Sequence, residues 1–325
     1  GLGDVYKRQA ENKSEEQDVI FLYNAEPEHA EKWRALLAAQ VPDLEFVEGF
    51  EAVDPARVTY LLTWKAVADI ERYTSLRVLF AAGAGVDQFD LSKIPESVAL
   101  VRMVDESLAD IMAEFVVMSA LALHREMPAY RAAQAAQVWE PLSILPASTS
   151  RVGVMGLGQL GQACLAQLRH LKFQLLGWNR SERSIDGVKT YTGPEELASF
   201  LSQCDILVNL LPLTDSTRGI LNRETLAQLP RGAGLINVGR GEHVVEADLV
   251  AALDAGQIGA AILDVFQQEP LPEGHPLWSH ARVWVTPHIA STMQVEGGAA
   301  VVAKNILRDL QGSELLHTVD RQAGY

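Results

Sequence analysis

The chain has 325 residues, of which 48% are hydrophobic and 21% are charged, a composition typical of a globular protein with room for two domains. Asp and Glu number 42 against 27 Lys and Arg, which gives a formal net charge of −15. This acidic balance argues against general binding to nucleic acid or to anionic membranes, but it is compatible with a local basic pocket for one small anion.

Two further features narrow the class of protein. No uninterrupted apolar run approaches the roughly 20 residues that a membrane span needs, and no secretory signal is visible. Cys164 and Cys204 lie inside apolar patterns, without a second Cys or a His at ligand spacing. We therefore expect a cytoplasmic protein with core thiols and no metal site. Residues 1–17 are polar and match nothing that follows, so we expect a disordered tail or an artefact there and exclude them from the fold.

From residue 18 onward, short apolar runs alternate with amphipathic runs, which is the pattern of buried strands and helices. The first set of predicted strands covers residues 18–23, 44–50, 58–64, 77–83 and 98–104. Helices are predicted between these strands over 28–40 and 67–73. Such alternation indicates a parallel sheet with helices on both faces.

A long helix with an apolar face is predicted over residues 105–126, ended by Pro128, and we assign it to dimerisation. The polar, alanine-rich stretch that follows contains Pro141 and Pro146, and we interpret it as a crossing between domains. A second set of strands is predicted over 151–156, 173–178, 205–211, 234–239, 259–266 and 282–287. The last helix, near 293–311, is expected to return to the first domain. The predicted domains are 18–104 with 292–325, and 105–291.

The stretch VGVMGLGQLG at 152–161 places three glycines between a short apolar strand and an amphipathic helix. Gly156 permits a tight turn, Gly158 lets the backbone approach a pyrophosphate, and Gly161 allows close packing of the helix on the strand. The first helical turn and the helix dipole then favour phosphate charge. The motif predicts a dinucleotide-binding Rossmann domain; the alternative is a plain tight turn into a helix.

A dinucleotide site of this kind usually has an Asp or Glu about 20 residues after the glycines, where it binds the adenosine ribose. Here the strand ends in Asn179, Arg180 and Ser181, and Arg183 follows. Asn179 removes a charge that would repel a 2′-phosphate, while the arginines and Ser181 offer hydrogen-bond donors to it. The pattern predicts an NADP pocket, with NAD as the weaker cofactor; the alternative is a solvated polar turn.

Three polar residues follow strands of the second set: Arg240 in LINVGRG, Glu269 in LDVFQQEP and His288 in VWVTPHIAS. Ligands bind at the carboxyl ends of strands in open parallel sheets. Arg240 can pair with a carboxylate through its planar fork. His288 can give a proton to a carbonyl oxygen as hydride arrives, and Glu269 can orient the imidazole and raise its pKa. Together they predict reduction of a 2-oxo acid; singly, each could be an ordinary loop residue.

With these motifs in this order, the chain resembles the D-isomer-specific 2-hydroxyacid dehydrogenases over nearly its whole length after residue 18. NVGRG, DVFQQEPLP and TPHIA match the three signature regions of that family. AAGAGVD, FLSQCDILVNLLPLT, HVVEADLVAALDAG and VDRQAGY are most similar to its bacterial glyoxylate/hydroxypyruvate reductase A group. One departure is visible: many relatives have GGAT-like residues after the catalytic His, where Ile289, Ala290 and Ser291 stand here. We interpret this as tuning near the nicotinamide.

The resemblance implies an α/β fold of two doubly wound parallel sheets, a Rossmann NADP-binding domain and a discontinuous, flavodoxin-like substrate domain. It implies that Arg240, Glu269 and His288 form the catalytic set, without a metal, in a homodimer clasped by the nucleotide domains. The cofactor-binding residues that we predict are Gly156, Gly158, Gln159, Leu160, Gly161, Asn179, Arg180, Ser181, Arg183, Leu211, Pro212, Thr217, Val238, Gly239, Arg240, Asp264, His288, Ala290 and Ser291.

The resemblance also places the substrate carboxylate against Arg240 and the backbone N–H groups of Gly85 and Val86. Closely spaced glycines after a strand can turn consecutive N–H groups toward one anion; the alternative is an ordinary strand-to-helix turn. Trp64 corresponds to a pocket-lining residue. Trp139 matches a position from which some relatives send a side chain into the partner subunit's site.

We therefore expect an enzyme that reduces glyoxylate or hydroxypyruvate with NADPH, to glycolate or D-glycerate. One alternative is a 2-oxo acid reductase of broader specificity, because side-chain preference depends on the width of the cleft. Another is a non-catalytic, nucleotide-sensing binding protein of the same fold. Turnover of a small 2-oxo acid separates the enzymes from the binding protein.

Overall fold

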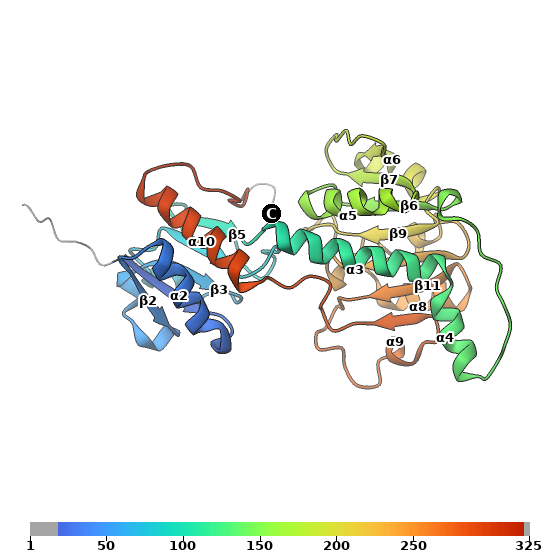
Figure 1. Ribbon diagram of the computed structural model, residues 1–325, viewed down its shortest axis with the longest axis horizontal. Helices are drawn as coiled ribbons and strands as arrows, with labels where there is room; N and C mark the ends of the chain where they lie inside the picture. Colours follow the sequence, from blue (N-terminus) through green and yellow to red (C-terminus); the bar gives the residue numbers. More distant parts are fainter. Residues whose placement is uncertain (1–18, 322–325) are drawn as a thin grey trace, which may run out of the picture. The chain divides into compact units, whose positions relative to one another are not determined.

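The computed structural model describes residues 19–321, so the expectation of a tail or artefact over 1–17 falls outside it. The described residues divide into two compact units, one that runs up to Val104 and resumes at Val295, and one of Asp105–Gln294. Each unit is built on its own sheet, as Figure 1 shows. The chain leaves the first unit after Val104 and returns to it at Val295.

The first unit contains a five-stranded parallel sheet with the order β2-β1-β3-β4-β5. Its strands are β1 (Val19–Asn24), β2 (Leu44–Glu48), β3 (Val58–Thr63), β4 (Val78–Ala81) and β5 (Ala99–Arg102), with 3₁₀ turns η1 (Pro27–His29), η2 (Phe50–Ala52), η3 (Pro55–Arg57) and η4 (Ile70–Arg72). Helices α2 (Ala30–Gln40) and α10 (Val295–Leu310) pack against each other. Ala299, Val302 and Ile306 form a fully buried stripe of α10 at helical spacing. The apolar face of this last helix therefore belongs to the core of the first unit.

All five strands predicted for this unit are present, but the helix predicted over 67–73 is wrong. The structure has only the 3₁₀ turn η4 there. Asp69, directly before the turn, adopts the left-handed conformation with a φ of 52°, which a right-handed helix does not accommodate. The run is also too short to form a helix without strong packing.

The second unit contains a seven-stranded parallel sheet with the order β12-β11-β10-β9-β6-β7-β8. Its strands are β6 (Arg151–Met155), β7 (Gln174–Asn179), β8 (Lys189–Thr192), β9 (Ile206–Asn209), β10 (Ala233–Asn237), β11 (Ile258–Leu263) and β12 (Val283–Val285). Its helices are α3 (Glu106–His124), α4 (Met127–Ala135), α5 (Gln159–His170), α6 (Gly193–Leu201), α7 (Arg223–Leu226), α8 (Glu246–Asp254) and α9 (Pro276–Ser279), with 3₁₀ turns η5 (Ala147–Thr149) and η6 (Gly241–His243). Two separate buried clusters pack on the sheet. Cys164 and Cys204 belong to them as buried free thiols. Two doubly wound parallel sheets are thus the fold that the sequence predicts.

Two elements of this unit differ from the predictions. The edge strand β8 is absent from the predicted set, because only Tyr191 of its four residues is buried and the strand lacks an apolar run. The polar stretch after α3 begins with helix α4, which has Pro128 in its first turn. Proline disrupts a helix when it lies in the helix interior. In the first turn, its fixed φ instead favours helix formation. The whole stretch lies inside the second unit, so it is not a crossing between domains.

Helix α3 begins at an N-cap, where the Asp105 carboxylate accepts the N–H of Leu108 at 2.9 Å. It packs along α5 and against strands β9, β10 and β11. Over Ser107–His124 it is, by length and composition, long and apolar enough to cross a membrane, with a mean hydropathy of 1.5. Half of that window is buried inside the protein, and α3 is therefore a core helix of the second unit.

Candidate active site

The predicted catalytic and cofactor residues of the second unit follow strands that stand side by side in its sheet. Arg240 follows β10, Glu269 follows β11, His288 follows β12, and the glycine turn follows β6. All of these strands are parallel. Their carboxyl ends therefore meet at one edge of the sheet, and the structure gathers these residues there.

The shortest contact at this edge joins His288 and Glu269. The Nδ1 atom of His288 lies 2.7 Å from Glu269 Oε2, and the N–H of Phe266 donates to Glu269 Oε1 at 2.9 Å. The hydrogen bond to Glu269 raises the pKa of His288 above its ordinary value, against the opposing effects of burial and of the Arg240 charge. Burial acts to raise the pKa of Glu269, but its hydrogen bonds from His288 and Phe266 outweigh it and the pKa is lowered. The pair is therefore built to keep a proton on His288.

The loop that carries His288 is held by Asp264, the residue after β11. The buried Asp264 carboxylate accepts the backbone N–H groups of Ile289 at 2.9 Å and Ala290 at 2.8 Å, and the Thr286 hydroxyl at 2.6 Å. His288 itself has a φ of 55°, a conformation that non-glycine residues adopt at a cost and that needs support from its surroundings. Asp264 supplies that support. From the sequence, Asp264 was predicted only to contact the cofactor.

The loops of Arg240 and Glu269 touch through their backbones. A Cβ atom at Gly241 would lie 1.8 Å from the carbonyl carbon of Phe266, so only glycine fits there. Arg240 is half-buried, and its Nη1 donates to the carbonyl of Gly239 at 2.8 Å. Its positive charge lowers the pKa of both His288 and Glu269. The guanidinium therefore acts electrostatically on the His–Glu pair.

The glycine turn has the shape that a dinucleotide needs. Gly156 has a φ of 96°, and a Cβ there would lie 2.7 Å from the Leu210 carbonyl oxygen; a Cβ at Gly161 would lie 2.0 Å from the carbonyl oxygen of Gly156. At Gly158 no atom lies within 4 Å of the Cβ position. Packing therefore requires the first and third glycines. The middle one opens a space at the start of α5, where Gln159 and Leu160 begin the helix and its dipole favours a pyrophosphate.

The strand β7 ends at Asn179, whose side chain is tied to the glycine turn. Its Oδ1 accepts the N–H of Leu157 at 3.3 Å, and its Nδ2 donates to the carbonyl of Ser181 at 2.9 Å and to the hydroxyl of that residue at 3.2 Å. Arg180 and Arg183 are exposed. Asn179 thus fixes the base of a loop that presents two arginines beside the turn.

The remaining predicted cofactor residues of this unit lie in the loops around that edge. Leu211 and Val238 are buried, and the Thr217 hydroxyl donates to the Pro212 carbonyl at 2.7 Å, which closes the loop after β9. Ser291 donates to the carbonyl of Leu108 in α3 at 2.7 Å. Thr217 and Ser291 therefore have structural roles in their loops besides any contact with a cofactor.

Three predicted substrate residues lie in the first unit. Gly85 and Val86 follow β4, and Val86 is buried and begins a turn in which its carbonyl accepts the N–H of Phe89 at 3.0 Å. The Trp64 indole donates to Glu26 Oε1 at 2.7 Å and lies against Gly83, where a Cβ would come within 2.7 Å of the ring. Its position on the glycine loop is therefore fixed from two sides.

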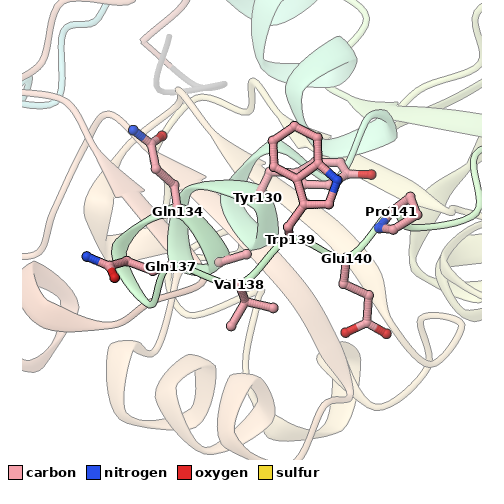
Figure 2. Close-up of a pocket in the computed structure, with 8 residues that line it drawn as sticks. Tyr130, Gln134, Gln137, Val138, Trp139, Glu140 and Pro141 are labelled. Carbon is pink, nitrogen blue, oxygen red and sulfur yellow. The ribbon is translucent and has the colours of Figure 1, made fainter.

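Trp139 lies apart from the other site residues. It is fully exposed on the arm after α4, where it lines a shallow pocket with Tyr130, Gln134 and Val138 (Figure 2). No residue of the predicted catalytic set lines that pocket. The structure of one chain therefore does not bring Trp139 into its own active site.

Sequence analysis missed three polar residues of the site: Asn209, Asn237 and His243, all completely buried next to Arg240. Asn209 and Asn237 are the last residues of the apolar strands β9 and β10. The sequence did offer one signal for the two asparagines, because each is a polar residue at the end of a buried strand. Only the structure shows that the three side chains contact one another.

Glycine turn, parallel sheet, and an Arg and a His–Glu pair at its carboxyl edge define a dehydrogenase that uses a nicotinamide dinucleotide. The family model described as D-isomer specific 2-hydroxyacid dehydrogenase, NAD binding domain, matches residues 117–290. The chain belongs to this family.

The chain is also similar to solved structures over most of its length. A D-isomer specific 2-hydroxyacid dehydrogenase from Xanthobacter autotrophicus Py2, in complex with NADPH and MES, is 37% identical with a TM-score of 0.90, over 95% of this chain and 100% of that chain. An NADPH-dependent glyoxylate/hydroxypyruvate reductase from Sinorhizobium meliloti, in complex with NADP and sulfate, is 38% identical with a TM-score of 0.85, over 94% and 100%. A probable 2-hydroxyacid dehydrogenase from Rhizobium etli CFN 42, in complex with NADP, HEPES and L(+)-tartaric acid, is 35% identical with a TM-score of 0.86, over 94% and 99%.

Proposed function

We propose that this dehydrogenase reduces glyoxylate and hydroxypyruvate with NADPH, to glycolate and D-glycerate. The observation that carries the proposal is the 2.7 Å contact between His288 and Glu269 at the sheet edge shared with Arg240. The similarity to the Sinorhizobium meliloti reductase supports the choice of substrates. A reductase of broader 2-oxo acid specificity would use the same residues.

In the proposed reaction, the glycine turn and the loop after β7 would hold NADPH, which when bound would supply a hydride for the carbonyl carbon of the oxo acid. Arg240 holds the substrate carboxylate through two parallel N–H donors of its planar guanidinium. Because Nδ1 of His288 is engaged by Glu269, Nε2 is the nitrogen that gives its proton to the carbonyl oxygen. Glu269 stabilises the imidazolium before the transfer and raises the pKa of His288, so the protonated form persists to higher pH. One hydride and one proton convert the oxo acid to the hydroxy acid.

The preference for NADPH rests on the loop after β7. Asn179 is neutral and its side chain is hydrogen bonded to Leu157 and Ser181, so no carboxylate at this position repels a 2′-phosphate. Arg180 and Arg183 are exposed on the same loop and would donate charge-assisted hydrogen bonds to that phosphate. NADH, which lacks the phosphate, would bind more weakly.

We further propose that the enzyme works as a cytoplasmic homodimer. Trp139 is fully exposed on an arm that carries it away from its own catalytic residues, an arrangement that suits insertion into a second copy. Helix α3 has the exposed Met118 on a largely apolar sequence, as expected of a helix at a subunit interface.

The proposal is tested by initial rates for a panel of small 2-oxo acids, each with NADPH and with NADH. We expect glyoxylate and hydroxypyruvate to have the highest kcat/KM, and NADPH to exceed NADH. His288→Ala is the matched control, because it removes the proton donor and leaves the glycine turn and the loop after β7 unchanged. Faster turnover of pyruvate or a bulkier oxo acid would favour the broader reductase instead. Cofactor binding without turnover of any oxo acid would contradict an enzymatic role.

A further inference from the structure

The main chain of Arg240 is surrounded by three polar side chains, Asn209, Asn237 and His243, which we call the strand-end cluster. All three are completely buried. Asn209 and Asn237 are paired residues at the ends of neighbouring strands, and His243 ends the 3₁₀ turn that follows Arg240. Buried polar groups are costly unless they are hydrogen bonded, so the partners of the cluster reveal what it holds in place.

The hydrogen bonds of the cluster fix its donors and acceptors. The N–H of Leu211 donates to Asn209 Oδ1 at 3.3 Å, so Asn209 Nδ2 is the donor to Asn237 Oδ1 at 2.8 Å and to His243 Nδ1 at 2.9 Å. His243 Nδ1 also accepts the N–H of Arg240 at 3.1 Å. An atom that accepts two N–H groups carries no proton, and His243 is therefore the tautomer protonated at Nε2.

Both sides of the Arg240 backbone are consequently held by buried side chains. His243 Nδ1 accepts its N–H, and Asn237 Nδ2 donates to its carbonyl oxygen at 3.0 Å. The other nitrogen of His243, Nε2, lies 3.2 Å from the carbonyl oxygen of Pro212. This carbonyl also accepts the Thr217 hydroxyl and belongs to the loop after β9. One imidazole thus bridges the loop of Arg240 and the loop of Pro212.

Packing shows that this bridge has little freedom. A Cβ atom at Gly239 would lie 3.0 Å from Asn209 Nδ2, 3.1 Å from His243 Nδ1 and 3.1 Å from the Leu211 carbonyl oxygen. The main chain before Arg240 therefore rests directly on the cluster. A shift of the imidazole would move the Arg240 backbone with it.

We propose that His243 is a positioning residue, one of whose ring nitrogens orients the substrate-binding loop and the other the cofactor-binding loop. Nδ1 sets the position of Arg240 and so the carboxylate of the oxo acid, while Nε2 sets the Pro212 loop and so the cofactor. The inference rests on the proposed function, in which Arg240 pairs with the substrate carboxylate, and on the cofactor contacts that the sequence predicts for Leu211 and Pro212.

Two substitutions separate the two nitrogens. His243→Asn can place an amide oxygen near the position of Nδ1, so it can still accept the N–H of Arg240 but cannot reach Pro212. His243→Gln can place an amide N–H near the position of Nε2, so it can still donate to Pro212 but leaves the N–H of Arg240 unpaired. The measurements are KM and kcat for the oxo acid that the wild-type enzyme reduces fastest, and the Kd of NADPH from its fluorescence on binding.

We expect the two variants to change different parameters. An unpaired buried donor should raise the KM of the oxo acid at least about fivefold in His243→Gln, with the Kd of NADPH within about twofold of wild type. His243→Asn should raise the Kd of NADPH and leave the KM nearly unchanged. Amide hydrogen exchange of the peptide that contains Arg240 should increase in His243→Gln alone. A general loss of packing would instead change both parameters in both variants.

His280→Gln is the matched control for a structural histidine of the same unit. Its Nδ1 accepts the N–H of Arg282 at 3.2 Å before β12, at the opposite end of that strand from His288, so KM and Kd should not change. Parallel changes of both parameters in the two His243 variants, or no change in either, would overturn the proposal. If a His243 variant fails to fold, Asn237→Asp gives the second test. Its carboxylate cannot donate to the Arg240 carbonyl, and an unchanged KM would equally overturn the proposal.

The choice of oxo acid keeps the two proposals distinguishable. Absence of turnover with glyoxylate and hydroxypyruvate contradicts the proposed substrates, yet the His243 variants are still compared on the acid that is reduced. Normal turnover of glyoxylate with unchanged His243 variants contradicts only the positioning role.

Discussion

Replacement of Glu269 by Gln changes the charge beside His288 while it keeps the size of the side chain. The carboxylate accepts two hydrogens, from Phe266 N–H at 2.9 Å and from His288 Nδ1 at 2.7 Å. An amide has only one oxygen, so it must turn its NH₂ group toward one of these two donors. The substitution therefore removes the main cause of the raised pKa of His288 and opposes its protonation.

The size of the effect follows from the hydrogen bond and its exposure. A hydrogen bond to a charged group contributes about 1.5–3 kcal/mol, and one pKa unit corresponds to about 1.4 kcal/mol. The side chains of His288 and Glu269 are 49% and 35% exposed, and screening by solvent puts the effect at the lower end. We expect the pKa of His288 to fall, with a change of about tenfold in its protonation equilibrium.

The pH profile of reduction measures this shift. In the proposed reaction the acid form of His288 is the active one, so reduction should decline as the pH rises through its raised pKa. In Glu269→Gln the decline should begin at a lower pH, which means a loss of about tenfold at a fixed pH above both pKa values. His288→Ala should lack this limb of the profile altogether, at a rate about 10²–10⁴-fold lower. An alkaline limb in the same place for Glu269→Gln and wild type would refute the tuning of His288 by Glu269.

Three other outcomes are expected. Arg180→Ala should reduce kcat/KM with NADPH by about tenfold, the loss of one charge-assisted contact, and should change it little with NADH; equal losses would argue against a phosphate pocket. Arg240→Lys keeps the charge but not the planar fork, so the KM of the oxo acid should rise and kcat should fall, whereas a kcat/KM equal to wild type would exclude a forked contact. Trp139→Ala should alter the KM or the substrate preference of a protein that sediments as a dimer and melts normally; a fully active monomer in solution would contradict the dimer.

The strands of both units could be predicted because each buried strand of a parallel sheet is a continuous apolar run. The failures have the same origin. β8 has a single buried apolar side chain and gives no such run, and the segment around Asp69 has apolar residues but a backbone that turns left-handed before it. Pro128 marked a boundary correctly, yet it begins a helix where we expected a loop. Local patterns thus predicted the buried strands better than they predicted the edge strand, the left-handed residue and the proline in a first helical turn.

The site shows a similar division. Arg240, Glu269 and His288 could be placed at one sheet edge because each follows a strand of the same parallel set. The supporting groups could not, because their roles depend on contacts across the sheet. Asp264 holds the His288 loop over a separation of more than twenty positions, and His243 faces Asn209 from a different strand connection. Such contacts become visible only when the chain is folded.

The contact between Gly241 and the carbonyl of Phe266 has a consequence for how this enzyme can vary. Two main chains touch where a methyl group would not fit, so the spacing between the loop of Arg240 and the loop of Glu269 is set by backbone atoms. Side-chain substitutions elsewhere can reshape the pocket without altering that spacing. Under the proposed function, the range of substrates can therefore change, while the backbone fixes the distance between the group that binds the carboxylate and the group that protonates the carbonyl oxygen.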